Sequence, residues 1–581
     1  MKINNDGKES MMLVYGLIFL GIWTGYYSAL KIYEGNKLYS IGIVVSIIFF
    51  IVAFRLYMKI KDIKVIKYLK DSWGKEIKKK RDFTKIRKLY DDLKKDDVFY
   101  VDDQTWFDLN MDNIYSKLDR NLTTPGEQFL YYMLRKPCFS EDKLKKRGEN
   151  INYLKDNNEV REKIQYNLHK LGKDKNAYLL DFLKDKLPNS KSIKLSLNIL
   201  LIMSISTIVY AIYLKKPVAM FYIMVMYFIN YYVHSKVKKN ILGDTSCIKY
   251  MYKVLICADS IISIKDLQKN IDEVNIIKKE LQPCRKLMKK AVSLIMSNTD
   301  GVDILMEYFN IFFLMETRAF FSTVKEIDDN RENIKKIYVY LGKIDALLSI
   351  ASYRNDIKSY VEPKFLENSK KLVLKKVIHP LVEKPVDNTI IVDRNVIITG
   401  SNMSGKSTFL RTLGINVLFA QTIYTCLCDE YEGDYFRIMT SISVSDSVTG
   451  GKSYYMGEAE AIYRIINSTK EVDYPIISFI DEIFRGTNPV ERINAAAEIL
   501  KYLAENNCRV FVATHDLELT NMVKEYYDNY YFTENVTKEG LNFDYKIKKG
   551  VTSTRNAVKI LEYIGYPKEI VENINNRIGK I

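Results

Sequence analysis

Four stretches of the chain carry no charged residue over the length of a helix, and they fall into two pairs. About 20 apolar residues of helix cross the roughly 30 Å hydrocarbon core of a bilayer. Only short links separate the members of each pair, so each pair is predicted to form an antiparallel hairpin in a membrane. The four stretches are Met11–Leu30, Leu38–Phe54, Leu195–Leu214 and Val218–Val233.

Two alternatives exist for these stretches. A secretory signal peptide would need a small-residue cleavage site, and Tyr26–Leu30 offers no convincing one, while a second apolar stretch follows at once. The second pair also fits a buried helical hairpin, because Val218–Val233 is short for a membrane crossing. We favour about four transmembrane helices.

Basic residues follow both hairpins. Many lysines and arginines lie between Arg55 and Arg81, and Lys236, Lys238 and Lys239 follow the second hairpin. Lys and Arg beside membrane helices are retained on the cytoplasmic side. The pattern predicts a multi-pass protein of the cell membrane, with its N-terminus and everything outside the hairpins in the cytoplasm.

The middle of the chain is predicted to be helical. Between Asp82 and Pro363, outside the second hairpin, the sequence is charged and poor in Gly and Pro, with apolar residues three or four apart in segments such as Ile262–Lys290. This pattern predicts long helices that pack through an apolar stripe. One interruption, Thr123-Thr124-Pro125-Gly126, predicts a turn that starts an amphipathic helix.

A phosphate-binding loop is predicted near residue 400. The strand Asn395–Thr399 precedes a G-x-x-x-x-G-K-S sequence, and a helix-like stretch follows it. Backbone N–H groups of such a loop surround phosphate oxygens at a helix N-terminus, its Lys neutralises the β and γ phosphates, and its Ser ligates Mg²⁺. The predicted ATP-binding residues are Gly400, Ser401, Asn402, Met403, Ser404, Gly405, Lys406, Ser407 and Thr408.

Two further apolar strands end in residues suited to hydrolysis. Ile476–Ile480 leads into Asp481, placed to hold magnesium, and Glu482, placed to polarise the attacking water. Arg509–Thr514 leads into His515, in the order expected of a histidine that senses the γ phosphate. A solvated strand end and a structural histidine are the alternatives, but the phosphate loop upstream favours chemistry. The predicted catalytic residues are Lys406, Glu482 and His515, and the predicted metal ligands are Ser407 and Asp481.

The composition is basic and contains few signs of disulfide bonding. A formal net charge of +17 suits DNA or anionic lipid, because Lys and Arg release condensed counterions when they bind a polyanion. Lys, Ile, Asn and Tyr are all abundant, so biased codon usage explains the charge equally well. The seven scattered cysteines favour a reducing compartment, and Cys426 and Cys428 fit a buried strand better than a metal site.

The sequences that surround these motifs resemble the MutS family. Gly400–Thr408 is similar to the family loop T-G-P-N-M-G-G-K-S-T, with two serines as departures. Asp481–Asn488 resembles D-E-I-G-R-G-T-S with Phe484 in place of a Gly, and Ala513–Thr520 resembles A-T-H-Y-F-E-L-T. Residues 550–571 match the terminal helix-turn region of the family, and weaker similarities lie at residues 118–130, 344–351 and 378–383.

The resemblance implies further site residues and a partner. In that family Gly450–Ser453 would be a loop that crosses a dimer, so that Ser453 contacts the γ phosphate of the ATP bound by the other subunit. The segment Tyr454–Glu458 departs from the family sequence. Asn388 matches an Asn near the adenine, while Pro385 stands where an aromatic residue is expected. The resemblance thus implies a homodimer through the ATPase domain, with ATP and Mg²⁺ as cofactors.

The predicted fold class is α plus α/β, with two transmembrane helical hairpins, a long-helix lever domain and a C-terminal P-loop ATPase domain of the ATP-binding-cassette class. The mismatch-reading domain that begins MutS repair proteins is replaced by the first hairpin and a basic stretch, so mismatch reading is not expected. The predicted divisions are residues 1–60 for the first hairpin, 61–194 for the basic linker and the start of the lever domain, 195–235 for the second hairpin, 236–377 for the lever domain and 378–581 for the ATPase domain.

Three functions are compatible with this sequence. We favour a dimeric, membrane-anchored ATPase coupled to the binding of mismatched or structured DNA by its helical levers and lysine-rich surfaces. The alternative is a cassette ATPase that drives a membrane or transport process without nucleic acid. Against transport, the second hairpin has few polar residues beyond Asn198, Asn230 and His234. A third function is a tether that binds ATP without hydrolysing it.

Overall fold

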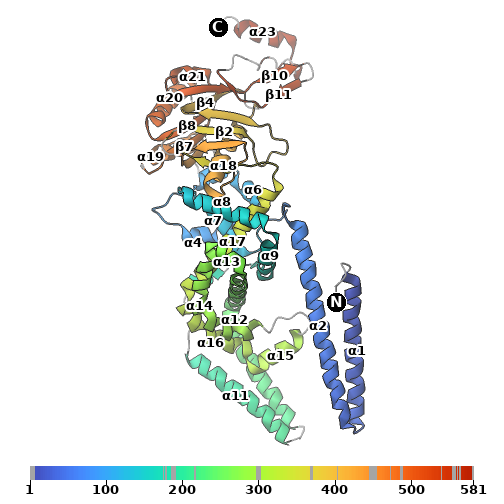
Figure 1. Ribbon diagram of the computed structural model, residues 1–581. Coiled ribbons are helices and arrows are strands. Elements are labelled where there is room, and N and C mark those ends of the chain that lie inside the picture. Colours follow the sequence, from blue (N-terminus) through green and yellow to red (C-terminus); the bar gives the residue numbers. More distant parts are fainter. Residues whose placement is uncertain are drawn as a thin grey trace.

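The computed structural model has a mixed α/β fold that is mostly helical. A sheet-containing part with the C-terminus lies at one end, helices fill the middle, and two helical hairpins extend from the other end (Figure 1). The residues described are 7–174, 176, 179–184, 191–214, 218–295, 303–366, 369, 371–401, 404–443, 454–470, 473–484, 488–537, 540–551, 558, 561 and 564–578.

The first hairpin consists of α1 (Gly7–Tyr33) and α2 (Ser40–Ser72), which pack through small residues. Ser46 Oγ of α2 donates a hydrogen bond to the Gly21 carbonyl oxygen of α1 at 2.6 Å. A Cβ atom on Gly42 would lie only 2.0 Å from Ser28 Oγ. Small residues allow such close approach of helices where lipid supplies no hydrophobic drive for association.

Three helices of the described chain are long and apolar enough, by length and composition, to cross a membrane. They are Met11–Tyr33, Lys37–Ser72 and Ser192–Leu214, and each contains one of the predicted apolar stretches. The fourth stretch, Val218–Val233, forms the first part of α12 (Val218–Ile262), which is not among the three. Membrane crossing by these helices stays a prediction.

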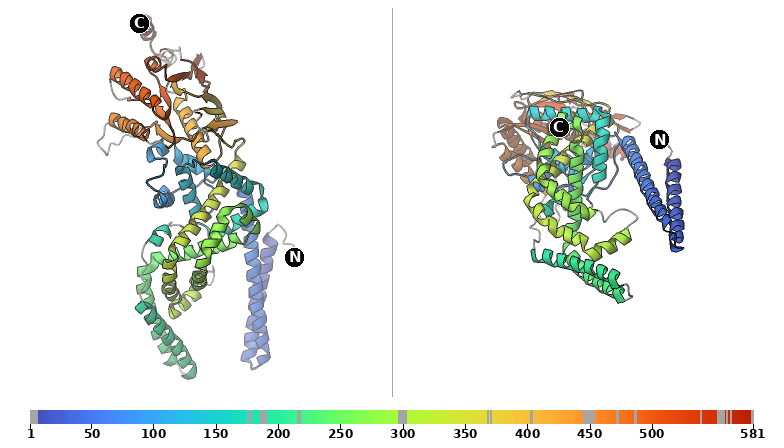
Figure 2. Two further views of the ribbon diagram at one scale, coloured as in Figure 1. Left: turned by 60° about the vertical axis from the view of Figure 1, so that its left-hand side comes forward. Right: turned by 60° about the horizontal axis from the view of Figure 1, so that its bottom comes forward.

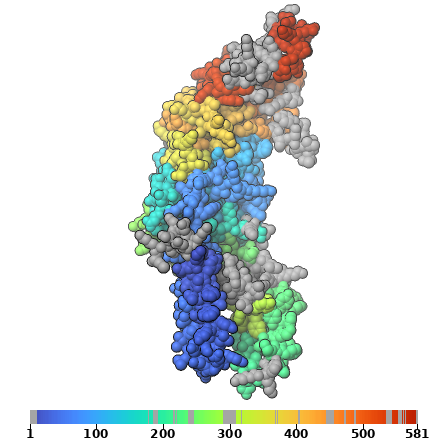
Figure 3. All heavy atoms as spheres, turned by 90° about the vertical axis from the view of Figure 1, so that its right-hand side faces the viewer, coloured from blue at the N-terminus to red at the C-terminus, as the bar shows by residue number. Residues whose placement is uncertain are grey.

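Both hairpins extend toward the same end of the molecule, away from the sheet and the C-terminus (Figures 1 and 2). In a space-filling view the α1–α2 hairpin, in blue, and the hairpin of α11 (Lys191–Leu214) with α12, in green, both project below the helical middle (Figure 3). One flat membrane could therefore accommodate both tips.

The middle of the chain is helical, as predicted, and it includes long helices such as α14, of 24 residues, and α17, of 26 residues. Its elements are α3 (Phe83–Ile86), α4 (Lys88–Leu93), α5 (Asp103–Asp108), α6 (Met111–Leu118), α7 (Thr124–Arg135), α8 (Glu141–Asp156), α9 (Asn158–Leu171), α10 (Leu179–Lys184), α13 (Lys265–Asn270), α14 (Asp272–Ile295), α15 (Asp303–Phe313), α16 (Met315–Asp329) and α17 (Arg331–Asp356).

The turn predicted at residues 123–126 begins α7 at its crossing with α17. Thr123 is the N-cap, and its Oγ1 accepts a hydrogen bond from Gly126 N at 3.1 Å. The buried Asp345 carboxylate of α17 accepts hydrogen bonds from Thr123 N at 2.8 Å and from Thr123 Oγ1 at 2.6 Å. A Cβ atom on Gly126 would lie 2.1 Å from Asp345 Oδ2, so glycine is required by this close approach.

The C-terminal part contains a six-stranded sheet in the order β12-β9-β4-β8-β7-β6, parallel except for β12. A four-stranded sheet, β1-β5-β2-β3, and a β10–β11 hairpin accompany it. The strands are β1 (Lys364–Phe365), β2 (Leu372–Val377), β3 (Asn388–Val392), β4 (Asn395–Thr399), β5 (Glu430–Gly433), β6 (Arg437–Ser441), β7 (Ile476–Asp481), β8 (Cys508–Thr514), β9 (Tyr527–Tyr531), β10 (Glu534–Thr537), β11 (Gly540–Phe543) and β12 (Lys548–Lys549).

Helices cover both faces of the six-stranded sheet, which explains why β4 and β7 are buried along their whole length. Alternate residues serve two cores: Val396 and Ile398 join the large core that includes α18, whereas Ile397 joins a second core with α20. The helices of this part are α18 (Lys406–Thr422), α19 (Tyr454–Ser468), α20 (Pro489–Glu505), α21 (Leu517–Met522) and α23 (Lys568–Ile578).

The helical middle and the sheet-containing part share one continuous apolar core. Polar contacts reinforce this junction: Cys138 N donates to the Gln421 carbonyl oxygen at 2.8 Å, and Arg354 Nε donates to Thr425 Oγ1 at 2.9 Å. α18 is thus packed directly against the helices that lead to the hairpins. The two cysteines of the C-x-C sequence, Cys426 and Cys428, are buried in this region, and all seven cysteines are free thiols.

Candidate nucleotide-binding and catalytic site

The predicted phosphate loop connects β4 directly to α18. Gly400, with φ 143°, follows the last residue of β4, and Gly405, with φ 100°, is the N-cap of α18. Residues with a Cβ atom rarely adopt these backbone angles, so the two glycines allow the chain to reverse around the helix N-terminus. Ser404 Oγ donates to the Ser401 carbonyl oxygen at 2.7 Å. Asn402 and Met403 lie outside the described residues.

Lys406 is the first residue of α18, and only 4% of it is exposed. Its Nζ donates hydrogen bonds to the carbonyl oxygens of Gly400 at 2.6 Å and Ser401 at 2.7 Å. The ammonium group therefore lies inside the curve of the loop, on the side where phosphate oxygens would be held. This is the position from which a lysine neutralises the β and γ phosphates. Thr408, one turn into the helix, is exposed.

Ser407 and Asp481 meet although 74 positions separate them in the sequence. Ser407 Oγ donates a hydrogen bond to Asp481 Oδ2, and Asp481 is the last residue of β7. Asp481 is 7% exposed. A hydroxyl and a carboxylate oxygen are ligands that Mg²⁺ prefers. The donor set fits the predicted metal site: Ser407 and Asp481 would hold Mg²⁺ there, whose positive charge would offset that of the phosphates.

Glu482 and His515 form a second contact at the same edge of the sheet. Glu482 follows β7, and its backbone N–H donates to the Ala513 carbonyl oxygen at 2.9 Å. Its φ of 60° lies in the left-handed region, a strain that clusters at functional sites. His515 Nδ1 lies 3.0 Å from Glu482 Oε1. The structure thus brings the predicted base and the predicted γ-phosphate sensor into hydrogen-bond contact.

The protonation of His515 reports on this contact and can be measured. The hydrogen bond that the protonated His515 ring donates to Glu482 is the main cause that raises the pKa of His515 above its ordinary value of 6.5. The stabilisation by the pair is therefore fully present below pH 6.5 and disappears as the pH rises through the raised pKa. Glu482→Gln is expected to shift the His515 titration to lower pH, observable by NMR of the four ¹³C-labelled histidines. Glu498→Gln, on the exposed side of α20, is the control; an identical His515 titration in both variants would contradict the pairing.

Phe484, which replaces a Gly of the resembled family motif, occupies a glycine-type conformation. Its φ is 60°, which is unfavourable for a bulky side chain. The ring is 6% exposed and packs against Tyr455 with centroids 5.2 Å apart. Burial of the aromatic ring offsets the backbone strain. The next three residues of the motif, 485–487, lie outside the described chain.

A cavity of about 320 Å³ adjoins the phosphate loop, with Gly405 and Thr408 in its wall. Tyr545 lines it from the segment after β11, and a Cβ atom on Gly405 would lie 3.2 Å from the Tyr545 ring. The predicted residue Asn388 is also in the wall. Its Nδ2 donates to the Tyr545 carbonyl oxygen at 2.9 Å, and its Oδ1 accepts from Ile547 N at 2.8 Å. Asn388 therefore positions the segment that carries Tyr545.

Sequence reasoning missed Tyr545, because nothing near it in the chain marks a ligand site. It is 45% exposed and stacks with Phe543 at a centroid distance of 5.7 Å. His379, which precedes the phosphate loop in the sequence, lines the same cavity. Burial lowers the pKa of His379 to about 4, so this side chain is uncharged at neutral pH, and Lys384 is the charged residue of a mostly apolar lining. The cavity is suited to a flat, neutral group beside the phosphate loop.

The predicted dimer-crossing loop, Gly450–Ser453, lies outside the described residues, but the chain that leads into it is held by α5. The Asp108 carboxylate accepts hydrogen bonds from Thr440 Oγ1 at 2.7 Å and from the backbone N–H groups of Ile442 and Ser443 at 2.9 Å each. Asp108 is 1% exposed, and burial raises its pKa. The helical middle thus holds the chain at residues 440–443, the last described residues before this loop.

Comparisons with known proteins show what the C-terminal part of the chain is similar to. A family model for MutS domain V matches residues 396–581, which include Lys406, Asp481, Glu482 and His515. The chain is 32% identical over 267 residues to the DNA mismatch repair protein MutS of Thermotoga petrophila, covering 44% of this chain and 33% of that protein. It is 30% identical over 262 residues to the protein of the same name from Thermus thermophilus, covering 44% and 31%.

These alignments cover only part of each relative. The chain spans about a third of the length of the curated relatives that it matches. The matched part is the C-terminal one, from β4 onward for the family model, and it contains Lys406, Ser407, Asp481, Glu482 and His515 but neither Asn388 nor His379. The resemblance inferred from the motifs is confirmed for this part: residues 396–581 match MutS domain V, and the identity of about 30% to MutS proteins supports a member of that family.

Proposed function

We propose that this protein is a membrane-anchored ATPase of the MutS type that binds ATP–Mg²⁺ at the β4–α18 loop and hydrolyses it with Glu482. The observation that carries the proposal is the hydrogen bond between Ser407 Oγ and Asp481 Oδ2. It joins the first turn of α18 to the end of β7 where a phosphate-bound magnesium ion needs a hydroxyl and a carboxylate. Lys406 lies within the same loop.

The catalytic roles follow from the neighbours of each side chain. Lys406 would neutralise the β and γ phosphates, and Ser407 with Asp481 would hold Mg²⁺. Glu482, at the next position of the chain, would accept a proton from the attacking water. His515, in contact with Glu482, would orient that carboxylate and respond to the γ phosphate.

Tyr545 is proposed to stack on the adenine ring, in place of the aromatic residue that Pro385 does not supply. Tyr545→Ala is expected to weaken ATP binding about tenfold, because base–aromatic stacking contributes roughly 1–3 kcal/mol. Tyr545→Phe retains the ring and is expected to bind ATP like the wild type. Affinities measured with a fluorescent ATP analogue test this; equal affinity of the Ala and Phe variants would rule out stacking.

A homodimer is part of the proposal. The family resemblance implies that Ser453 reaches the ATP of the second subunit, and Asp108 holds the chain at Ile442 and Ser443, seven residues before Gly450. Closure of two ATPase domains on ATP would thereby be linked to the helical middle. Cross-linking of the full chain with and without ATP measures this dimerisation.

Membrane anchoring is supported by the form of the hairpins. Both project to one end of the molecule, and apolar residues such as Phe19, Trp23 and Ile41 are more than half exposed on the first. Contiguous apolar surface of this extent is unusual on a protein surrounded by water. The small-residue contact between α1 and α2 is of the kind that stabilises helix pairs in lipid.

Coupling to DNA is proposed because the relatives with similar C-terminal parts are named DNA mismatch repair proteins. The test is ATP turnover of the purified full chain with mismatched, branched, single-stranded and no DNA. We expect stimulation by at least one DNA structure and binding that weakens steeply with salt. Turnover indifferent to every DNA, with no salt-sensitive binding, would sink this coupling and leave the ATPase proposal standing.

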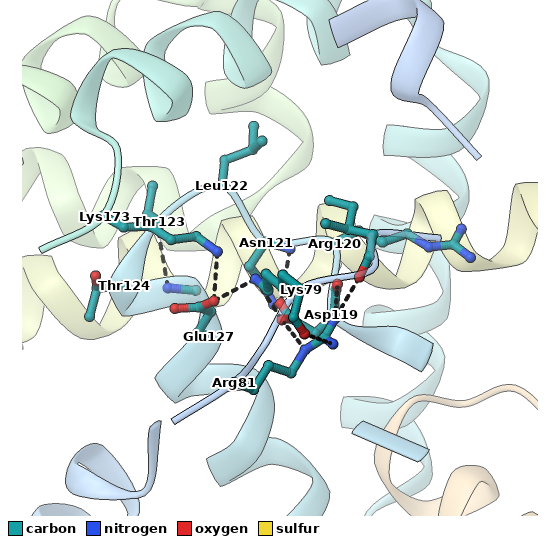
Figure 4. Close-up of polar contacts among 12 residues, drawn as sticks. Lys79, Arg81, Asp119, Arg120, Asn121, Leu122, Thr123, Thr124, Glu127 and Lys173 are labelled. Atoms are coloured by element: carbon teal, nitrogen blue, oxygen red, sulfur yellow. Dashed lines mark hydrogen bonds and ion pairs between the residues drawn. The ribbon is translucent and has the colours of Figure 1, made fainter. Parts of the chain in front are cut away.

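A second candidate function, in which the ATPase moves the hairpins without nucleic acid, is favoured by one observation. The segment after α2 is clamped to the helical middle by Lys79 and Arg81, which both contact the buried Asp119 (Figure 4). Such a rigid link could transmit movement to the first hairpin. Turnover that depends on lipid and ignores DNA would support this function instead.

A further inference from the structure

A second cavity lies at the base of the second hairpin, away from the phosphate loop. It lies between α11 and α16 and has a volume of about 370 Å³. Lys194 and Asn198 of α11 and Arg318 and Ser322 of α16 line it, with Leu197 as part of its apolar wall. Two cations thus share one cavity with an apolar surface, which is the combination that an anionic amphiphile requires.

The two cations lack acidic partners among the described residues. Arg318 Nε donates to the amide oxygen of Asn198 at 3.2 Å, and its terminal nitrogens have no described partner. Elsewhere in the helical middle a comparable cation is neutralised: Lys335 pairs with Asp92 at 2.7 Å. Partial burial lowers the pKa of Arg318, as expected where no carboxylate compensates its charge, but an arginine remains protonated.

The position of the cavity along α11 indicates the kind of anion. Lys194 lies just before the apolar run that begins at Leu195, within the candidate membrane span Ser192–Leu214. Leu195, Ile199 and Ile202 fall on one face of α11 at helical spacing and are 63%, 49% and 63% exposed. An apolar track therefore starts beside the cationic cavity and continues toward the tip of the hairpin.

The neighbouring helix α15 carries exposed aromatic residues at the base of the second hairpin. It packs against α11 and α12, and its Tyr308 and Phe309 are each 55% exposed. Aromatic side chains are enriched where membrane helices pass through the headgroup region. The base of the second hairpin is thus placed where lipid phosphates would be found if the hairpin enters a membrane.

We infer that this cavity binds the phosphate of an anionic glycerophospholipid, with Lys194 and Arg318 as its ligands and the acyl chains along Leu195, Ile199 and Ile202. The inference rests on the proposed membrane anchoring and adds a lipid class and a site to it. A basic pocket at the cytoplasmic end of a membrane helix is a known form of lipid headgroup site. The two cations would hold the hairpin at a fixed depth.

The test uses the full chain, purified in detergent and depleted of lipid. It is titrated with dihexanoyl phosphatidylglycerol, dihexanoyl phosphatidylcholine and inorganic phosphate, and bound ligand is counted by native mass spectrometry. We expect phosphatidylglycerol to bind tightest, and the double variant Lys194→Gln, Arg318→Gln to lose about thirtyfold in affinity for it, from the contribution of two cations. Lys236→Gln, an exposed cation of α12 outside the cavity, is the matched control.

Three results would overturn the site: equal binding of phosphatidylglycerol by the double variant and the wild type, equal binding of phosphatidylcholine, or binding of inorganic phosphate as tight as that of the lipid. Unchanged ATP turnover in detergent verifies that the variant is folded. Alkaline extraction of cell membranes tests the anchoring separately. A protein released by that wash would refute membrane anchoring, while the detergent titration would still judge the cavity.

Discussion

Replacing Glu482 by Gln is expected to lower the rate of ATP hydrolysis about a hundredfold or more while leaving ATP binding intact. A positioned general base contributes roughly 10²–10⁴-fold to such a reaction, and the amide cannot accept the proton of the attacking water. The substitution keeps the size of the side chain, so the left-handed backbone at Glu482 and its hydrogen bond to Ala513 should persist. Single-turnover hydrolysis and equilibrium ATP binding by the full chain measure the two effects separately.

The matched control is Glu518→Gln, an exposed carboxylate on α21 near His515 but outside the cluster. It should hydrolyse ATP like the wild type. If Glu482→Gln also retained turnover within a fewfold, Glu482 would not be the base. A protein that only tethers and never hydrolyses ATP would show no turnover in any variant, which separates that function from the proposed one.

Replacing Asp119 by Ala is expected to destabilise the helical middle by about 3–5 kcal/mol, the range for breaking a buried ion pair by removal of one partner. The Asp119 side chain is completely buried. Its Oδ2 lies 2.8 Å from Lys79 Nζ and 2.8 Å from Arg81 Nε, and its Oδ1 accepts from Asn121 Nδ2 at 2.9 Å (Figure 4). Without the carboxylate, Arg81 Nε and Asn121 Nδ2 lose their acceptor, while Lys79 keeps only its contact with Glu127 at 2.6 Å.

The loss is measured by denaturant unfolding of the full chain in detergent. Glu141→Ala breaks an exposed pair with Lys145 at 2.7 Å and should leave the stability unchanged, since such surface pairs contribute little. An equally small effect for Asp119→Ala would show that the link between the first hairpin and the helical middle does not depend on this carboxylate.

The same carboxylate has a predictable pH dependence. Burial pushes the pKa of Asp119 upward, but the charges of Lys79 and Lys173 outweigh burial, and the pKa lies below its ordinary value of 3.8. Its contribution to stability is therefore fully present above pH 3.8 and is lost as the pH falls through the lowered pKa. Acid unfolding of the wild type should accordingly show a step that Asp119→Ala lacks.

Local sequence patterns were sufficient to predict the central strands and the polar residues at their ends. The predicted strand Asn395–Thr399 is β4 to the residue, and the apolar run before Asp481 is β7. These strands are buried on both faces, so their sequences are continuously apolar and bounded by polar residues. The glycines of the predicted phosphate loop could also be identified from the sequence, because each is required by the backbone angles at its own position.

Contacts between distant segments could not be read in this way. Tyr545 reaches the cavity beside Gly405 across 140 positions, and its neighbourhood in the chain contains no ligand motif. Asp108 holds Ile442 and Ser443, which precede the predicted dimer-crossing loop, from more than 300 positions away. Neither the hydrophobic periodicity nor the spacing of motifs predicts which buried carboxylate contacts a strand that comes much later in the sequence.

The sequence by itself predicted the type of each helix and strand and the two apolar hairpins. It also predicted the order of the proposed phosphate-binding and hydrolytic residues. Each of these features depends on residues only a few positions apart. The tertiary structure alone decided that the helical middle and the sheet share one core, that both hairpins project to one end, and that Lys194 and Arg318 line one cavity. Those features arise from packing between segments far apart in sequence, where many pairings satisfy the same local pattern and only the close-packed core selects one.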